Sequence, residues 1–212
     1  MPTSRANDKP TGVTDGHPWL ARALDFTMRP LYPARRLVVP EATGKVLEVG
    51  VGTGLNFGLY RDVEALAGID PDPYMLERAR PRAAELPFPV ELHQTGAERM
   101  PFADAHFDTA VVTFTLCTIP DPDAALAEVR RVLKPNGRLL FVEHTRSIQP
   151  LTGVVQDALT PLWKLIGGGC HLNRSAVDLV GRAGFRITQT EPVWGERWTL
   201  LPVYRGVAER AA

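Results

Sequence analysis

The sequence predicts an α/β fold built on a seven-stranded, mostly parallel sheet, with helices on both faces and an antiparallel pair of strands at the C-terminal end. Apolar runs of strand length alternate with helical segments along most of the chain. A glycine-rich segment, Gly50-Val51-Gly52-Thr53-Gly54, follows the first apolar run, and Asp70 ends the second. Alternation of this kind is typical of parallel sheets, whose strands need long crossover connections.

Length and composition favour one domain. The chain has 212 residues with 24 basic and 24 acidic side chains, and this balance argues against a nucleic-acid partner, which usually recognises a basic excess. The two cysteines, Cys117 and Cys170, lie in no ligand-spaced motif, so we expect no metal. Two cysteines in a chain of this size also indicate a reducing, cytoplasmic location. The oligomeric state does not follow from the sequence.

The first 40 residues differ from the rest. Residues 1–16 are polar and lack the apolar segment of a signal peptide, so we expect a mobile tail there. Residues 17–40 predict a helical lid over the main domain, interrupted by Pro30 and Pro33. Residues 41–212 are expected to form the main domain.

The main domain follows an alternating order. Strands are expected at 45–50, 64–70, 89–95, 106–114, 138–144, 186–194 and 200–209, the last two as a hairpin. Helices are expected at 54–61, 72–86, 121–133, 151–166 and 173–185, with a turn at 134–137. Asp72 and Asp121 should cap their helices, each followed by proline at the first helical position. Asn173 should cap the last helix, which Gly184 should end.

The helix expected at 151–166 is amphipathic and contains Pro161, which should kink it. Its apolar face comprises Leu151, Val154, Val155, Ala158, Leu159, Leu162, Trp163 and Ile166. We favour an interpretation in which this face covers the sheet and roofs a substrate pocket. In the alternative, the face contacts a membrane surface. The basic residues for such a contact would be Arg22, Arg29, Arg35 and Arg36 of the N-terminal segment.

The glycine-rich segment and Asp70 predict a ligand at the carboxyl edge of the sheet. Glycine lets the backbone approach a ligand closely. Asp70 lies 22 residues after Glu48, close to the spacing of about 20 residues at which an acidic side chain binds a ribose. Leu55 breaks the dinucleotide pattern, so a nucleotide-dependent oxidoreductase is only a distant alternative. A cofactor-binding module without catalysis is a further one.

Four motifs occur in order: "LEVGVGTG", "GIDPDPYMLERAR", "AERMPFADAHFDTAVV" and "LAEVRRVLKPNGRLLFVEH". They resemble the Rossmann-like class I S-adenosylmethionine-dependent methyltransferases over roughly residues 44–145. The resemblance implies S-adenosylmethionine as cofactor and S-adenosylhomocysteine as product. It also implies a set of cofactor-binding residues: Glu48, Gly50, Gly52, Thr53, Gly54, Asn56, Asp70, Pro71, Met75, Gly96, Ala97, Glu98 and Thr113.

Within that set the resemblance implies separate roles. The glycines face the methionine part, Glu48 organises their loop and Asp70 binds the ribose. Pro71 and Met75 flank the adenine. Where many relatives carry an aspartate for the adenine amino group, this chain has Gly96, so recognition passes to Ala97 and Glu98. Thr113 lies beneath the transferred methyl.

The C-terminal half, "TLCTIPDPDAALAEVRRVLKPNGRLLFVEH" and "QDALTPLWKLIGGGCHLNRSAVDLVGRAGF", resembles microsomal thiol S-methyltransferases and their bacterial relatives. This resemblance makes a small thiol the first choice of acceptor. Phosphatidylethanolamine N-methylation and quinone C-methylation are alternatives, and the lipid alternative would place the protein at the periphery of a membrane.

Three residues are candidates for catalysis. His144 follows the fifth expected strand and could deprotonate an acceptor, or simply cap a turn. His171 and Arg174 follow three glycines and could stabilise a thiolate, or belong to a linker. Cys117 lies in an apolar stretch typical of a protein core.

Overall fold

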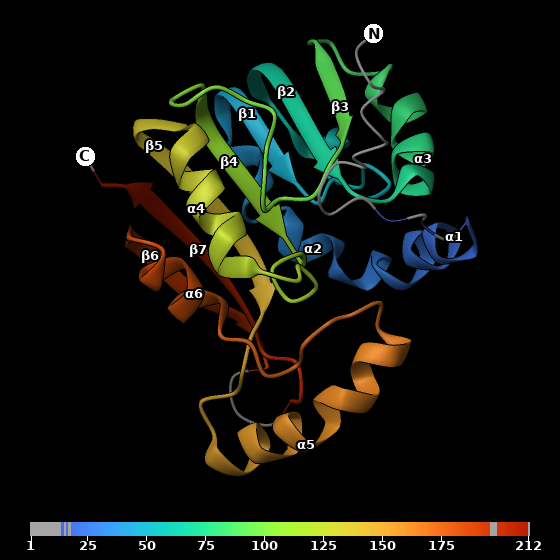
Figure 1. The fold of residues 1–212 in the computed structure, drawn as a ribbon, viewed down its shortest axis with the longest axis vertical. Helices are drawn as coiled ribbons and strands as arrows, with labels where there is room; N and C mark the ends of the chain where they lie inside the picture. Colours follow the sequence, from blue (N-terminus) through green and yellow to red (C-terminus); the bar gives the residue numbers. More distant parts are fainter. Residues whose placement is uncertain (1–13, 15, 17, 196–198, 212) are drawn as a thin grey trace, which may run out of the picture.

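A computed structural model describes residues 14, 16, 18–195 and 199–211, and its sheet has seven strands in the order β3-β2-β1-β4-β5-β7-β6 (Figure 1). The strands are β1 (Thr43–Val49), β2 (Asp62–Asp70), β3 (Val90–Gln94), β4 (Phe107–Thr113), β5 (Leu133–His144), β6 (Phe185–Trp194) and β7 (Val203–Arg210). The first five pair in parallel, whereas β7 is antiparallel to both β5 and β6. The predicted fold class is therefore confirmed.

The central strands are buried on both faces. Successive residues of β4 alternate between two apolar clusters, because side chains along a strand point to opposite faces: Val111 joins one cluster and Val112 the other. Leu139 and Leu140 of β5 alternate in the same way. Such continuous apolar runs are typical of parallel strands covered on both sides.

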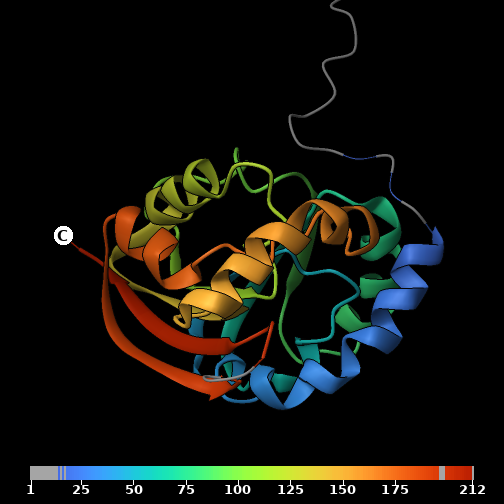
Figure 2. The same ribbon diagram turned by 90° about the horizontal axis from the view of Figure 1, so that it is seen from below.

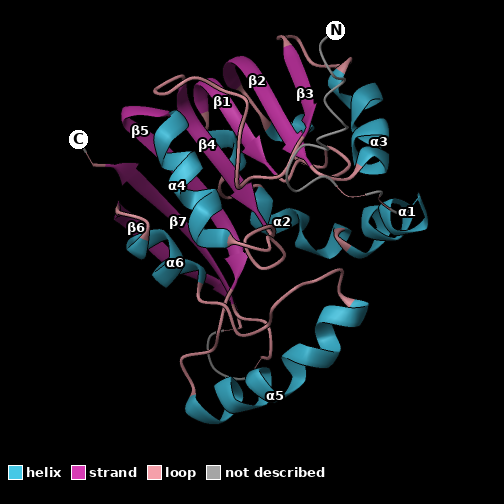
Figure 3. Cartoon of the chain, in the orientation of Figure 1, coloured by secondary structure: helices cyan, strands magenta, loops and turns pink. Residues whose placement is uncertain are grey.

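The helices are α1 (Pro18–Thr27), α2 (Tyr32–Arg35), α3 (Pro73–Ala83), α4 (Pro122–Val132), α5 (Pro150–Ile166) and α6 (Ala176–Arg182). Figure 3 shows α4 and α6 in front of the sheet and α5 apart from it, beyond the ends of the strands. Asp72 Oδ1 accepts from the Tyr74 amide at 2.8 Å, and Asp121 Oδ1 accepts from the Ala124 amide at 3.0 Å. Both predicted caps are confirmed, and each contributes about 1 kcal/mol to helix stability.

Three local predictions are wrong. The segment expected as a helix at 54–61 forms only a 3-10 turn, Phe57–Leu59, because its polar side chains turn inward to bond a buried carboxylate described below. The expected turn at 134–137 is an irregular part of β5, where the register with β4 shifts. The last helix is capped by Ser175, while Asn173 donates to Asp157 instead. Gly184, with φ of 82°, follows this helix as expected.

The orientation of α5 also differs from the favoured prediction. Its buried residues are Gly153, Gln156 and Thr160, and its apolar face is exposed, reaching 84% exposure at Leu151. Gln156 explains the difference: its amide accepts from the Ser147 amide at 2.8 Å and donates to the Thr145 and Leu200 carbonyls. Loop backbone needs polar partners, so the polar face packs inward. The apolar face therefore does not roof the sheet.

The N-terminal segment forms α1 and α2 and contacts the main domain. Asp25 of α1 binds Arg78 and Arg82 of α3, and Thr53 donates to the same carboxylate. Arg35 is buried and unavailable to a membrane, which corrects one of the four expected basic contacts. Closure of this segment as a lid stays a prediction. Apart from residues 14 and 16, the expected mobile tail lies outside the described residues.

The close approach of β7 to β5 gives a stability prediction. Gly206 pairs with Phe141, and a methyl group at Gly206 would overlap the fully buried ring. Gly206→Ala should therefore lower the free energy of unfolding by about 1–3 kcal/mol, as overpacking does. Gly181→Ala is the matched control, because nothing lies within 4 Å of the added methyl group and alanine favours the helix. Equal denaturation midpoints for the two variants would contradict the packing argument.

Candidate active site

Five parallel strands, β1 to β5, end at one edge of the sheet, and the glycine-rich segment leaves β1 there. The amides of Gly50 and Val51 donate to the Ile69 carbonyl at 2.9 and 3.0 Å, which ties the loop to β2. Gly50 has φ of 70°, and a Cβ there would overlap Thr115. Gly52 has φ of 54°, and nothing lies within 4 Å of where its Cβ would be. The backbone at Gly52 is thus open to a ligand.

Asp70 lies beside this loop at the end of β2. Its Oδ2 accepts from the Gly52 amide and its Oδ1 from the Asp72 amide, both at 2.9 Å. Burial raises the pKa of Asp70 to about 6, although the two amide hydrogen bonds favour the charged form. Each oxygen retains further acceptor capacity. The carboxylate is therefore positioned and oriented before any ligand binds.

Glu48 is buried beneath the loop and organises it. Its carboxylate accepts from Asn56 Nδ2 and from the Tyr60 hydroxyl, both at 2.8 Å. Burial raises the pKa of Glu48 to about 7, while these two hydrogen bonds and the charge of Arg35 oppose the rise. The partners come from the segment directly after the glycines, so Glu48 fixes the course of that segment.

Arg35 belongs to the same buried network, and sequence analysis assigned it a different role. Its Nη1 donates to Asn56 Oδ1 at 3.0 Å and to Thr113 Oγ1 at 2.5 Å. Its guanidinium also lies 5.2 Å from the centre of the Phe114 ring, a cation–π distance. Asn56 further donates to Thr113 at 3.0 Å. Asn56 and Thr113, both predicted to bind the cofactor, thus hydrogen-bond to each other and to Arg35 at the end of β4.

The remaining predicted cofactor residues flank Asp70 or the loop. Thr53 donates to Asp25 of α1, and the ring of Phe57 fills the space beside Gly54. The Pro71 carbonyl accepts from the Thr14 amide and from Gln94, both at 3.3 Å. Met75 is buried in α3.

The segment from Gly96 to Glu98 follows β3, next to Asp70. The Thr95 amide donates to the Asp70 carbonyl at 3.2 Å, which brings the segment to the same edge. Ala97 is buried, and Glu98 accepts from the Asp121 amide at 3.4 Å. These residues therefore lie at the same edge of the sheet as Asp70.

A second buried carboxylate, Glu143 of β5, holds the loop after β4. Its Oε1 accepts from the Thr115 amide at 2.6 Å and from the Leu116 amide at 3.1 Å. Burial raises the pKa of Glu143 to about 7, while these bonds oppose the rise. The loop begins at Phe114, whose φ of 54° is rare for an aromatic residue. Glu143 thus stabilises a strained turn, and sequence analysis missed this role.

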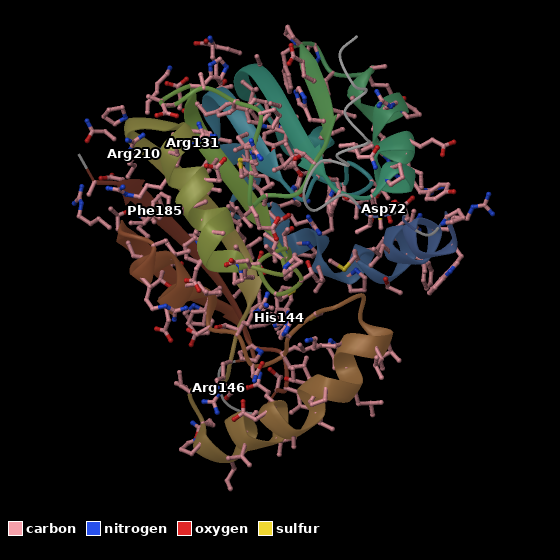
Figure 4. The ribbon with its side chains drawn as sticks, in the orientation of Figure 1. Asp72, Arg131, His144, Arg146, Phe185 and Arg210 are labelled. Carbon is pink, nitrogen blue, oxygen red and sulfur yellow. The ribbon has the colours of Figure 1, made fainter. Side chains whose placement is uncertain are left out.

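His144 follows Glu143 and lies at the lower end of the sheet, toward α5 (Figure 4). Its Nε2 lies 3.0 Å from the Cys170 sulfur. Burial would lower the pKa of His144, but the hydrogen bond with Cys170 and the charge of Glu143 outweigh it and raise the pKa. A hydrogen bond from Cys117 lowers the pKa of Cys170, and His144 acts in the same direction. The predicted catalytic histidine is therefore paired with a thiol.

The other two predicted catalytic residues, His171 and Arg174, contact backbone carbonyls. Arg174 donates to the Leu116 and Ile119 carbonyls at 2.8 and 2.6 Å. The Cys117 carbonyl contacts His171 through both the backbone amide, at 2.9 Å, and Nδ1, at 3.1 Å. Burial lowers the pKa of His171. Both residues therefore position the loop after β4.

The central part of the chain matches a known family. Residues 47–141, from β1 to β5, match the family described as methyltransferase domain. The matched range includes the glycine-rich loop, Asp70 and Thr113, whereas Arg35, Glu143 and His144 lie outside it.

Two relatives are similar to the chain over a longer stretch than the family match. A thiol S-methyltransferase of Rattus norvegicus is 35% identical over 150 residues, which cover 69% of this chain and 62% of the relative. A phosphatidylethanolamine N-methyltransferase of Cereibacter sphaeroides is 42% identical over 126 residues, which cover 58% of this chain and 62% of the relative. The chain thus spans less than two thirds of the length of either relative.

Solved structures show the same fold. An S-adenosylmethionine-dependent methyltransferase of Thermotoga maritima superposes with a TM-score of 0.66, covers 92% of this chain and 100% of its own, and is 24% identical. Within the described residues, no helix combines the length and the apolar character that crossing a membrane requires.

Proposed function

We propose that this methyltransferase domain transfers the methyl group of S-adenosylmethionine to a small thiol. The observation that carries the donor site is the arrangement of Gly52 and Asp70: an open glycine backbone bonded to a buried carboxylate at the carboxyl edge of the sheet. Ligands of open α/β sheets bind at this edge. The similarity to a thiol S-methyltransferase over 69% of the chain supports the acceptor.

The residues around the loop fit this donor. Asp70 would accept hydrogen bonds from the two ribose hydroxyls, and Gly50 and Gly52 would face the methionine part. Pro71, Met75 and Ala97 would surround the adenine. Glu48 and Asn56, which are fully engaged with each other and their neighbours, would support the loop rather than contact the donor.

The sulfonium group of the donor supplies an electrophilic methyl group, and the chain must present a thiolate in line with it. In the reaction a bond forms between the acceptor sulfur and the methyl carbon, and the bond from that carbon to the sulfonium sulfur breaks. The acceptor proton passes to solvent or to a protein group. Thr113 and the loop after β4 lie at the strand end where the acceptor would meet the donor.

The acceptor is tested by measuring S-adenosylhomocysteine release by the purified protein with hydrogen sulfide or an alkyl thiol. We expect release that depends on the thiol and saturates with its concentration. Phosphatidylethanolamine vesicles and a quinone precursor are the comparison acceptors. Release with either of these, and none with thiols while the donor still binds, would contradict the thiol proposal.

The role of Asp70 predicts a pH dependence of donor binding. Below the pKa of about 6 the carboxyl binds a proton and loses its charge-assisted hydrogen bonds to the ribose, so affinity should fall as the pH drops through 6. Asp70→Asn should weaken binding by about 1.5–3 kcal/mol, or roughly tenfold to a hundredfold, and flatten the dependence between pH 5 and pH 7.

Calorimetry at several pH values measures both effects. Asp62→Asn is the matched control, because Asp62 is exposed at the opposite end of the same strand. This substitution should change neither the affinity for the donor nor the pH dependence of that affinity. Both variants retain Glu48 and Glu143, so a difference between the two pH profiles of binding is assigned to the substitution at Asp70. An unchanged pH profile in Asp70→Asn would remove Asp70 from the ribose site.

A lipid acceptor is the second candidate, and the exposed apolar face of α5 favours it. Leu151, Leu162 and Leu165 are 84%, 62% and 82% exposed. Figure 2 shows α5 across the end of the molecule where the strands finish, with α1 and α2 along one side. An apolar helix face beside an active site can rest in the interfacial region of a bilayer. The similarity to a phosphatidylethanolamine N-methyltransferase points the same way.

Sedimentation with phosphatidylethanolamine-containing vesicles tests this contact. If α5 binds lipid, the triple variant Leu151→Ser, Leu162→Ser, Leu165→Ser should leave most of the protein in the supernatant, because the exposed apolar area is lost. The matched control changes the same three leucines to methionine, which keeps the apolar surface. Equal sedimentation of the serine and methionine variants would exclude α5 as the lipid contact.

A further inference from the structure

Three side chains far apart in the sequence meet at the end of β5. The sulfur atoms of Cys117 and Cys170 and a ring nitrogen of His144 all lie within 4.8 Å of one another. Cys117 belongs to the loop after β4, His144 ends β5, and Cys170 follows α5. All three are at most 9% exposed. The spacing of these residues in the chain gives no sign of the cluster.

The cluster is held in place by the backbone around it. The His171 amide donates to the Cys117 carbonyl at 2.9 Å, which ties the two cysteine segments together directly. Glu143 and Arg174 fix the loop that carries Cys117, as described above. His144 is paired with Val203 of β7. The three side chains are therefore positioned by three separate and mutually bonded segments.

The donor set and its dimensions match those of a zinc site. Two thiolates and an imidazole are ligands that Zn²⁺ prefers, and tetrahedral coordination places ligand atoms about 3.5–3.8 Å apart. The observed contact of 3.0 Å between His144 Nε2 and the Cys170 sulfur, within a cluster spanning 4.8 Å, requires only small side-chain shifts. The ring nitrogen beside the Cys170 sulfur is Nε2, and His144 Nδ1 is buried with no hydrogen-bond partner among the described residues.

Charge also favours a cation here. Two thiolates and a neutral imidazole would neutralise a divalent ion, which makes its burial favourable. No fourth histidine, cysteine or acidic side chain in the described ranges joins the group. Three protein ligands with one open position are the pattern of catalytic zinc, whereas structural zinc is usually held by four.

We propose that Cys117, His144 and Cys170 bind one Zn²⁺ ion whose fourth position takes the acceptor thiol as a thiolate. The metal-binding part stands independently, and the acceptor part rests on the proposed thiol methylation. Coordination to Zn²⁺ deprotonates a thiol, so the proton goes to solvent and the sulfur stays nucleophilic. The subsequent methyl transfer forms one carbon–sulfur bond and breaks one, with no oxidant or reductant.

The test uses the full chain with its thiols reduced and its metals removed by a chelator, titrated separately with Zn²⁺ and Co²⁺. We expect one equivalent of each to bind, and Co²⁺ to show thiolate charge-transfer absorption. Cys117→Ser and Cys170→Ser should each weaken metal affinity. The loss should exceed the roughly tenfold to hundredfold cost of changing a residue that only supports a ligand. His106→Ala, at an exposed histidine, is the matched control and should bind as the unaltered protein does.

Folding of the serine variants is checked by donor affinity, which should be unchanged because no cysteine belongs to the donor site. Absence of stoichiometric binding would overturn the metal site, as would serine variants that bind as tightly as the unaltered protein. A Cys117–Cys170 disulfide that forms under mild peroxide in a protein that does not bind Co²⁺ would overturn it in favour of a redox pair.

The acceptor part has its own readouts. Addition of an alkyl thiol should alter the cobalt spectrum of the Co²⁺-loaded protein, and an unaltered spectrum would overturn coordination of the acceptor. Thiol-dependent S-adenosylhomocysteine release that persists undiminished after metal removal would also overturn it while leaving thiol methylation intact. A thiol-sensitive cobalt spectrum without any such release would leave the site standing and reject thiol methylation.

Discussion

The structure around the glycine-rich loop depends on the buried carboxylate of Glu48. A charge at the end of β1 is costly to bury unless polar groups surround it. Asn56 and Tyr60 supply hydrogen bonds and Arg35 supplies a positive charge. To reach Glu48, the segment after the glycines must turn inward, and this abolishes the helix that follows the first strand in simpler α/β units. The open backbone at Gly52 is a consequence of that inward turn.

A second buried acid repeats this design at the loop after β4. Glu143 binds the amides that follow Phe114 and so holds the loop that leaves β4. Thr113 lies between the two networks, bonded to Arg35 and Asn56 on one side and directly preceding the loop on the other. Neighbouring strand ends thus fix the glycine-rich loop and the loop after β4 relative to each other. This fixed geometry would suit the proposed methyl transfer, whose barrier depends on alignment.

The exposed face of α5 follows from the same need to satisfy polar groups. Gln156 is fully buried, and its amide bonds the Ser147 amide and the Thr145 and Leu200 carbonyls. Packing that amide inward turns the leucines of α5 outward. The apolar surface is then available beside the site, where a hydrophobic acceptor or a lipid surface would approach.

The sequence by itself determined the sheet and the caps at Asp72 and Asp121, because each depends on local periodicity or on residues close in the chain. It placed Asp70 at the strand edge for the same reason. Only the tertiary structure decided which face of α5 is buried, what Arg35 binds and that Cys117, His144 and Cys170 meet. Those outcomes depend on polar partners contributed by distant segments, and the spacing of residues along one chain carries no information about contacts of that kind.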